Sequence, residues 1–324
     1  MTKDDDVPTL QQIMEREYPR PPEIIKRLLS PEEIALFVAR QKEGKSTLTF
    51  QLAIDISCGD KFLDRYETSR QNVLYIDYEN RFGRIKDRAL DLARGRQVDR
   101  LFVKAFDIMS ERDVGLTGEE YVNLHGYVRQ TNPELVIIDP FRYAFGKTHG
   151  KSLSEESQAV IAIDQLSNLR TLNPNLASII VHHVKKRQDF TKASLKLKDD
   201  PRSWIEQSYG SQALLAHVDT IWGLEQDGDG HVFATVPRAA EPITIHLEKQ
   251  PDSERFLLNT VDSFSFKTVQ QREAWSRLPN DFGWRELKPL GFSNNMVNQL
   301  LRQGKAAGLL IQDAKKRYHK VTNQ

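Results

Sequence analysis

A glycine–lysine–serine run in the first third of the chain carries the strongest chemical signal. The pentapeptide EGKST, residues 43–47, follows an apolar segment, residues 34–38, and opens a helix-like segment, residues 46–56. Backbone N–H groups at such a strand-to-helix turn bind phosphate, because they and the positive end of the helix dipole face the anion. Lys45 is expected to neutralise the β- and γ-phosphates, and the Ser46 hydroxyl to coordinate Mg²⁺. The sequence therefore predicts a site for ATP and Mg²⁺.

One position of this P-loop departs from the full motif. The motif has glycine five residues before Gly44, and this chain has Ala39 there. An ordinary helix start with an exposed lysine is the alternative interpretation. The predicted nucleotide-binding residues at this turn are Ala39, Glu43, Gly44, Lys45, Ser46 and Thr47.

Two further apolar segments end in carboxylates that could serve phosphate hydrolysis. Residues 135–138 are followed by Asp139, which predicts a second contributor to the Mg²⁺ shell; a buried strand that ends in a turn at Asp139 is the alternative. Residues 73–76 are followed by Asp77 and Glu79. In an extended chain these two side chains would point the same way, and one of them could orient a water molecule toward the γ-phosphate.

A pair of histidines ends another apolar segment, residues 178–181. Either His182 or His183 could sense the γ-phosphate through a hydrogen bond. A metal site formed by the pair is a poor alternative, because adjacent side chains on a strand face opposite sides.

Short apolar strands alternate with helical segments over the first 250 residues, and this order positions the polar strand ends together. The pattern predicts an α/β fold with a mainly parallel sheet covered by helices on both faces. Residues 232–236 and 243–247 are expected to form a hairpin at the sheet edge. From residue 267 the order changes to three helical segments and two strands around a basic turn, which predicts a small C-terminal winged-helix domain. We expect a polar leader over residues 1–20, an ATPase domain over 21–262 and the winged helix over 267–324.

Charge is unevenly divided within a nearly neutral chain of net charge +1. Residues 267–324 contain 11 Lys and Arg against 4 Asp and Glu, whereas the rest contains 35 against 41. The balance excludes a uniformly basic nucleic-acid coat and a uniformly acidic solvating protein.

One cysteine excludes an internal disulfide. The absence of a long apolar run or a signal-like N-terminus predicts a cytoplasmic protein.

Two basic regions are candidate DNA-binding surfaces. The first is the segment of about residues 185–202, with the rings of Phe190 and Trp204 nearby for occasional stacking on DNA bases, although a solvated loop is the alternative. The second is the predicted recognition helix and wing of the tail, although a winged helix can also bind protein. The predicted DNA-binding residues are Lys186, Arg187, Lys192, Lys196, Lys198, Asn294, Asn295, Asn298, Arg302, Lys315, Lys316 and Arg317.

Taken together, residues 21–247 resemble the RecA-fold ATPases, and within them the RepA-like branch of hexameric plasmid replicative helicases and mobile-element ATPases. The resemblance implies a RecA-like P-loop NTPase core, a homo-oligomer such as a hexamer, single-stranded DNA in a central channel, and a replication or recombination partner protein. It places Glu79 as the catalytic carboxylate, Asp139 in the Walker B position and His183 as the sensor. It places Arg88 near the adenine. Many relatives carry an arginine that acts on a neighbour's ATP where this chain has Tyr209, which leaves Arg238 as the candidate finger.

Two hypotheses remain open from the sequence. The first is an ATP-hydrolysing, ring-forming DNA motor or helicase that acts in DNA replication or mobility. The second is an ATP-switched DNA-binding regulator or an adaptor ATPase without unwinding activity, which Ala39 and Tyr209 favour.

Overall fold

The computed structural model describes most of the chain. The described residues are 9–18, 21–94, 103–107, 114–145, 154–183, 195–209, 212–250, 253–259, 274–275, 277–287, 293–306, 310–313 and 317–320. Among the helices in these ranges, none is both long enough and apolar enough to cross a lipid bilayer.

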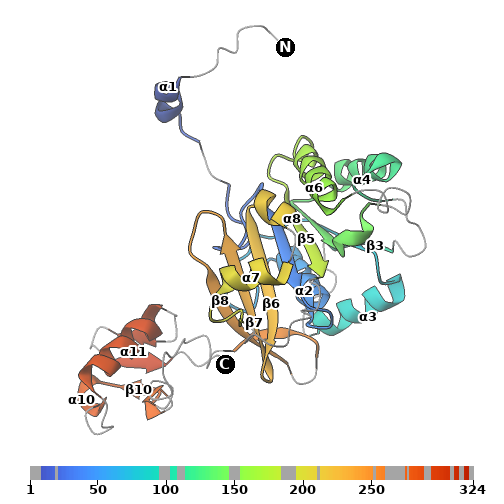
Figure 1. Cartoon of the computed structure of the whole chain (residues 1–324). Coiled ribbons are helices and arrows are strands. Elements are labelled where there is room, and N and C mark those ends of the chain that lie inside the picture. Colours follow the sequence, from blue (N-terminus) through green and yellow to red (C-terminus); the bar gives the residue numbers. More distant parts are fainter. Residues whose placement is uncertain are drawn as a thin grey trace.

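A nine-stranded sheet organises the described part of residues 34–258 (Figure 1). Its spatial order is β3-β2-β4-β5-β1-β6-β7-β8-β9. The five pairings from β3 to β6 are parallel, and those from β6 to β9 are antiparallel. The strands are β1 (Ile34–Ala39), β2 (Val73–Asp77), β3 (Val103–Asp107), β4 (Leu135–Asp139), β5 (Ala177–His183), β6 (Thr220–Asp227), β7 (Gly230–Pro237), β8 (Ile243–Lys249) and β9 (Phe256–Leu258).

Helices cover both faces of this sheet, as Figure 1 shows. Residues of α2 and α3 share one core cluster with one face of the strands, and residues of α4, α6, α7 and α8 share a second cluster with the other face. The central strands β1, β2 and β4 are buried along their whole length, because each has helices on both sides. The helices are α2 (Lys45–Cys58), α3 (Phe82–Leu92), α4 (Gly118–Thr131), η2 (Phe141–Tyr143), α6 (Glu155–Leu169), α7 (Pro201–Tyr209) and α8 (Gln212–His217).

This architecture confirms the predicted α/β class with a mainly parallel sheet. The predicted hairpin is also present as β7 and β8, although β9 pairs with β8 and takes the outer position. Before the sheet lies a short helix, α1 (Leu10–Glu15), which begins with a capping box between Thr9 and Gln12.

The described C-terminal residues form a smaller unit with its own apolar cluster. It contains α10 (Trp284–Leu287), α11 (Asn294–Ala306) and a three-stranded antiparallel sheet in the order β10-β12-β11. Its strands are β10 (Asp281–Phe282), β11 (Leu310–Gln312) and β12 (Tyr318–Lys320). Leu287, Val297 and Leu301 pack together with Phe282 in its core. Most of the first predicted helix lies outside the described residues, so the winged-helix assignment and the domain boundaries stay predictions.

Candidate active site

The turn between β1 and α2 has the backbone that phosphate binding requires. Gly44 is the N-cap of α2 with φ 91° and ψ 17°, a left-handed conformation that glycine adopts without strain. A Cβ at this position would also lie 2.7 Å from Cζ of Phe256. The glycine is therefore required twice, once for the backbone angle and once for the close approach of β9. The free N–H groups of the first turn of α2 start directly after it.

Ala39, in place of the first motif glycine, causes no backbone strain. It is the last residue of β1 and is paired with His183 on one side and Leu224 on the other. The positive-φ residues of this turn are Lys42 and Gly44, and Ala39 is not among them. An alanine is accommodated here because the chain is still extended.

The ammonium group of Lys45 is buried and is held by two protein atoms. Its Nζ donates to the carbonyl oxygen of Arg40 at 3.0 Å and lies 2.8 Å from Nδ1 of His183. Burial lowers the pKa of Lys45 to about 8, although the charges of Asp139 and Glu43 act in the opposite direction. Burial and the Lys45 charge lower the pKa of His183 to about 4. His183 is thus neutral near pH 7 and accepts the lysine hydrogen bond through Nδ1.

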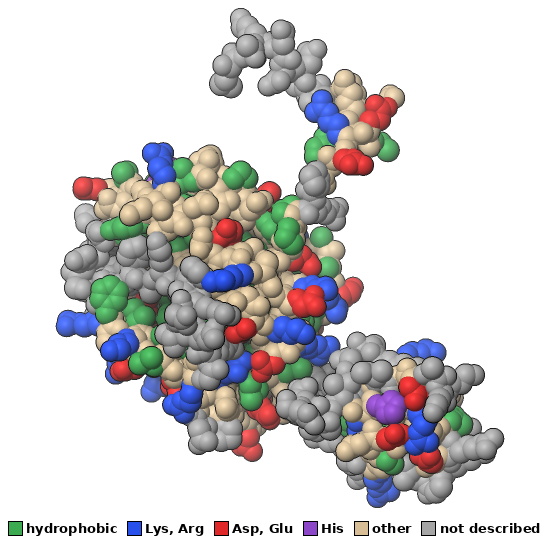
Figure 2. All heavy atoms as spheres, turned by 180° about the vertical axis from the view of Figure 1, so that it is seen from behind, with side chains coloured by type: hydrophobic (Ala, Val, Ile, Leu, Met, Phe, Trp, Pro, Cys, Tyr) green, Lys and Arg blue, Asp and Glu red, His purple; other side chains and the backbone are tan. Residues whose placement is uncertain are grey.

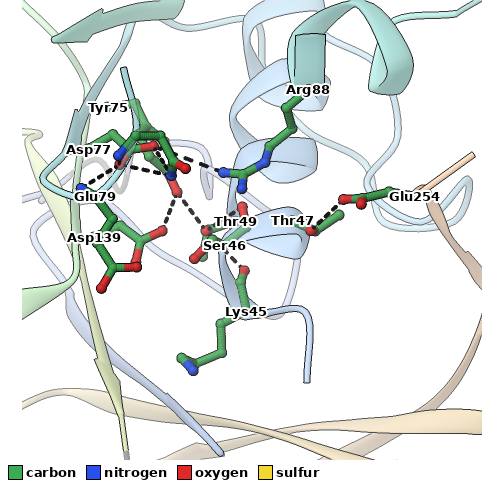
Figure 3. Close-up of polar contacts among 11 residues, drawn as sticks. Lys45, Ser46, Thr47, Thr49, Tyr75, Asp77, Glu79, Arg88, Asp139 and Glu254 are labelled. Carbon is green, nitrogen blue, oxygen red and sulfur yellow. Dashed lines mark hydrogen bonds and ion pairs between the residues drawn. The ribbon is translucent and has the colours of Figure 1, made fainter. Parts of the chain in front are cut away.

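Asp139 lies at the carboxyl end of β4, next to the start of α2 (Figure 3). Its buried carboxylate accepts a 2.6 Å hydrogen bond from the Tyr75 hydroxyl, which also lies 3.1 Å from Oγ1 of Thr49. Burial raises the pKa of Asp139 to about 6, while hydrogen bonds from Tyr75 and Ser46 favour its charged form. Ser46 and Asp139, the two predicted Mg²⁺ residues, therefore contact each other.

Asp77 and Glu79 do not share an extended face, so that expectation was wrong. The strand β2 ends at Asp77, whose buried carboxylate accepts the backbone N–H groups of Glu79 and Asn80 at 2.9 and 2.8 Å. This local cap turns the chain, because an aspartate readily bonds the backbone two and three residues on. Asp77 is consequently occupied by its own turn, and Glu79 is left partly exposed. An ion pair of 3.5 Å joins Glu79 to Arg142, in the turn η2 after Asp139.

Arg88 points from α3 toward Asp77, with Nη1 3.9 Å from the carboxylate (Figure 3). Its predicted place near an adenine stays a prediction.

Thr47 points to the other flank of α2, where its hydroxyl donates to Glu254 at 3.1 Å. Sequence reasoning missed Glu254 because nothing local distinguishes it from other surface acids.

Arg238 lies at the opposite end of the sheet from the P-loop. It follows β7, in which Pro237 pairs with Thr220 at the start of β6, and its backbone N–H donates to Asp219. The P-loop follows Ala39, which pairs with β6 four residues further along. Arg238 therefore cannot complete the phosphate site of its own chain, and its role toward a neighbour stays a prediction.

Few of the predicted channel residues belong to the described part of the chain. Lys186, Arg187 and Lys192 lie outside it. Lys198 is exposed and forms a 2.8 Å ion pair with Asp227 at the end of β6, and Lys196 lies two residues earlier. These two lysines are thus near the same sheet edge as the P-loop.

Trp204 was expected to stack on DNA bases, and this expectation was wrong. Its ring is buried in the core, and its indole N–H donates to the buried carboxylate of Glu225 at 3.0 Å. The same carboxylate accepts the backbone N–H of Leu197. Trp204 therefore packs in the core, where Glu225 joins it to Leu197, and does not face a DNA strand.

The tail places its predicted DNA residues in two different situations. On α11 the side chains of Asn295, Asn298 and Arg302 are exposed. Arg317, by contrast, pairs with Asp281 at 2.7 Å and with Glu286 at 3.1 Å. Figure 2 shows acidic, basic and histidine side chains gathered on one face of this unit. The side chain of Asn294 and all of Lys315 and Lys316 lie outside the described residues.

The donor set fits Mg²⁺ held together with nucleotide. In the described ranges no group of three or more His, Cys, Asp or Glu side chains could enclose a metal ion. Mg²⁺ in nucleotide sites needs less, because one or two protein oxygens, phosphate oxygens and water complete its shell. The Ser46 hydroxyl and the Asp139 carboxylate supply such oxygens beside the phosphate-binding turn.

The chain is similar to two solved structures, each at low sequence identity. No curated protein matches the chain. A KaiC-like protein from the hyperthermophilic archaeon Pyrococcus horikoshii OT3 has a TM-score of 0.45 and 10% identity, covering 73% of this chain and 93% of that one. A DnaB-like replicative helicase, described together with its interactions with primase, has a TM-score of 0.49 and 14% identity. The match covers 70% of this chain and 57% of that one. This chain thus spans less than two thirds of that helicase.

The family assignment rests on a sequence match instead of these two structures. Residues 5–189, more than half of the chain, match the family described as the AAA domain. The matched region contains the P-loop, Asp139 and His183 on a mainly parallel sheet. The chain therefore belongs to the AAA domain family.

Proposed function

We propose that this chain is an ATP-hydrolysing, ring-forming DNA motor or helicase of the RepA-like type, acting in replication or mobility of DNA. The observation that supports it best is that Lys45 and Ser46 of the P-loop lie beside Asp139 at the end of β4, with Glu79 in the turn that follows β2. Single-stranded DNA is the proposed substrate at the basic sheet edge near Lys198, and duplex DNA the proposed partner of the tail.

The residues would divide the reaction among them. The N–H groups at the start of α2 and the Lys45 ammonium bind the phosphates and neutralise charge that develops on the γ-phosphoryl group. Ser46 and Asp139 would hold Mg²⁺, which would supply further neutralisation of the phosphate charge. Glu79 orients the attacking water and accepts its proton. His183, which is neutral, would donate its ring N–H to the terminal phosphate once Lys45 turns from it toward the nucleotide.

ATP hydrolysis measured with and without single-stranded DNA tests this proposal. The wild-type chain should hydrolyse ATP faster with DNA, Lys45→Ala should lose nucleotide binding, and Glu79→Gln should bind ATP but not cleave it. Glu248→Ala, an exposed acid on β8, is the matched control for Glu79. Undetectable hydrolysis by the wild-type chain with every DNA tested would reject the motor.

Mixing variants tests the ring and the proposed role of Arg238. Arg238→Ala and Glu79→Gln should each be inactive alone. In a ring, a random mixture restores about a quarter of the interfaces, where intact Glu79 meets intact Arg238 from a neighbour. No recovery on mixing would exclude Arg238 as a trans-acting finger.

A second candidate is an ATP-switched DNA-binding regulator without unwinding activity. It is favoured by the resting contacts Lys45–His183 and Glu79–Arg142, which occupy the two groups that hydrolysis needs. The Glu79–Arg142 pair is half exposed and is worth at most about 1 kcal/mol, so Arg142→Ala should raise DNA-free hydrolysis up to about fivefold. Efficient separation of a forked duplex by the wild-type chain would reject this candidate.

A further inference from the structure

Glu254 stands on the flank of the P-loop helix that faces away from the predicted Mg²⁺ residues. Figure 3 shows Asp139 and Glu79 on one side of α2, and Thr47 with Glu254 on the other. The Glu254 carboxylate accepts the Thr47 hydroxyl at 3.1 Å and is exposed. No step of the proposed mechanism uses it.

The backbone around Glu254 is bonded to both α2 and α3, and its carboxylate accepts the Thr47 bond. The Glu254 N–H donates to Asp91 of α3 at 2.8 Å. Two residues on, the backbone of Phe256 exchanges two hydrogen bonds with the buried Gln51 side chain, at 2.8 and 2.9 Å. The Phe256 ring closes against Gly44. These contacts place Glu254 and Phe256 beside the phosphate-binding turn.

The direction of a bound nucleotide follows from the other side chains. Lys45, Ser46 and Asp139 define where the terminal phosphates and Mg²⁺ would lie. In the binding mode proposed here, the remainder of the nucleotide leaves the turn by the opposite flank, past Thr47. The first group reached after the phosphates is the sugar, which brings ribose hydroxyls toward Glu254.

We propose that Glu254 is a specificity-determining residue that accepts a hydrogen bond from a ribose hydroxyl, so that the site selects ribonucleotides over deoxyribonucleotides. This assignment rests on the proposed ATP site. An ionised carboxylate accepts hydrogen bonds only, which matches a sugar hydroxyl and repels phosphate. It has about four lone-pair sites, so it can accept a ribose O–H while it keeps the Thr47 bond. Acidic side chains bind ribose hydroxyls in the same way in dinucleotide sites.

Equilibrium binding by the full chain, in Mg²⁺ and without hydrolysis as a readout, tests the assignment. The ligands are ATP, 2′-deoxy-ATP, 3′-deoxy-ATP and ITP, because ITP keeps the ribose and lacks the adenine amino group. The wild-type chain should bind at least one deoxy form about tenfold more weakly than ATP, since one charge-assisted hydrogen bond is lost. Glu254→Ala should bind ATP about tenfold more weakly, and should bind that deoxy form as the wild type does.

Three variants make the result specific. Glu254→Gln keeps an acceptor and should recover part of the discrimination. Glu248→Ala removes the same charge from the same sheet edge and should leave the ATP to deoxy-ATP ratio unchanged. Lys45→Ala should abolish binding of all four ligands. Thermal unfolding of each variant shows whether it is folded.

Each other outcome overturns the assignment in a recognisable way. Equal affinity of the wild type for all four ligands, or a ratio that persists in Glu254→Ala, shows that Glu254 does not read the sugar. Weaker binding of ITP alone assigns Glu254 to the base. Tighter binding of every nucleotide by Glu254→Ala makes the carboxylate an anionic block. Failure of the wild type to bind any nucleotide rejects the proposed function itself.

Discussion

The Lys45 ammonium group touches the ring of His183, with 2.8 Å between Nζ and Nδ1. The P-loop cation is thereby joined to the last residue of β5, directly before the segment predicted to meet single-stranded DNA. A phosphate that draws Lys45 toward itself must break or reorganise this contact. Phosphate binding at Lys45 would therefore change a contact of the residue that directly precedes that segment.

The low pKa of Lys45 predicts that ATP affinity depends on pH above neutrality. With a pKa of about 8 in the free chain, the ammonium is charged at pH 7 and loses its proton as the pH rises. Bound phosphates raise this pKa, so affinity should be constant from pH 6.5 to 7.5 and should then fall by up to about tenfold per pH unit. His183, with a pKa of about 4, contributes nothing in this range. Lys45→Arg should flatten the alkaline limb in a binding titration, and a limb that persists would assign the titration to another group.

Removal of the Tyr75 hydroxyl should weaken the site through Asp139. Tyr75→Phe removes a buried 2.6 Å hydrogen bond to a carboxylate, worth about 1.5–3 kcal/mol, and raises the pKa of Asp139 further. The free energy of unfolding should fall, and half-maximal ATP binding should require more Mg²⁺. Tyr78→Phe, which removes a buried bond to the Val114 carbonyl, should affect unfolding only. An identical Mg²⁺ requirement in both variants would contradict the prediction.

Gly44→Ala should damage both stability and nucleotide binding. The left-handed backbone and the 2.7 Å approach to Phe256 together predict a loss of about 1–3 kcal/mol in the free energy of unfolding. Gly126→Ala in α4 has open space around its Cβ and should leave stability equal or slightly higher. Chemical denaturation of the two variants measures the difference, and equal stability would mean that the turn relaxes freely.

The tail predicts different outcomes for two arginines. Arg302 is exposed, so Arg302→Ala should weaken duplex binding for all sequences and reduce the salt slope by about one. Arg317 already pairs with Asp281 and Glu286, so Arg317→Ala should change thermal unfolding of the tail more than DNA affinity. Salt-dependent binding of the full chain to duplex DNA distinguishes them. Equal salt slopes for both variants would show that Arg317 leaves its carboxylates to bind DNA.

The parts of the fold that the sequence predicts are those with a repeated local pattern. Apolar runs such as residues 135–138 are strands because helices on both faces leave no polar position. Asp77 and Glu79 were misplaced because a capping turn, which has no periodicity, overrides the extended alternation. Trp204 was misassigned because an indole ring suits a core and a stacking surface equally, and only its buried partner Glu225 distinguishes the two. Glu254 was missed because its partner Thr47 is distant in the chain.

The two hydrogen bonds between Gln51 and Phe256 join residues 205 positions apart. A chain that is still being synthesised can form the P-loop turn early, but Phe256 cannot pack beside Gly44 until β9 has left the ribosome. Contacts of such long sequence separation form late, because the entropy of closing the intervening loop must be overcome first. A nascent chain or a truncation that stops at residue 250 would therefore carry the phosphate motif within an incomplete nucleotide site. Because these contacts form in this order, the complete nucleotide site cannot form until β9, the strand before the tail, has been synthesised.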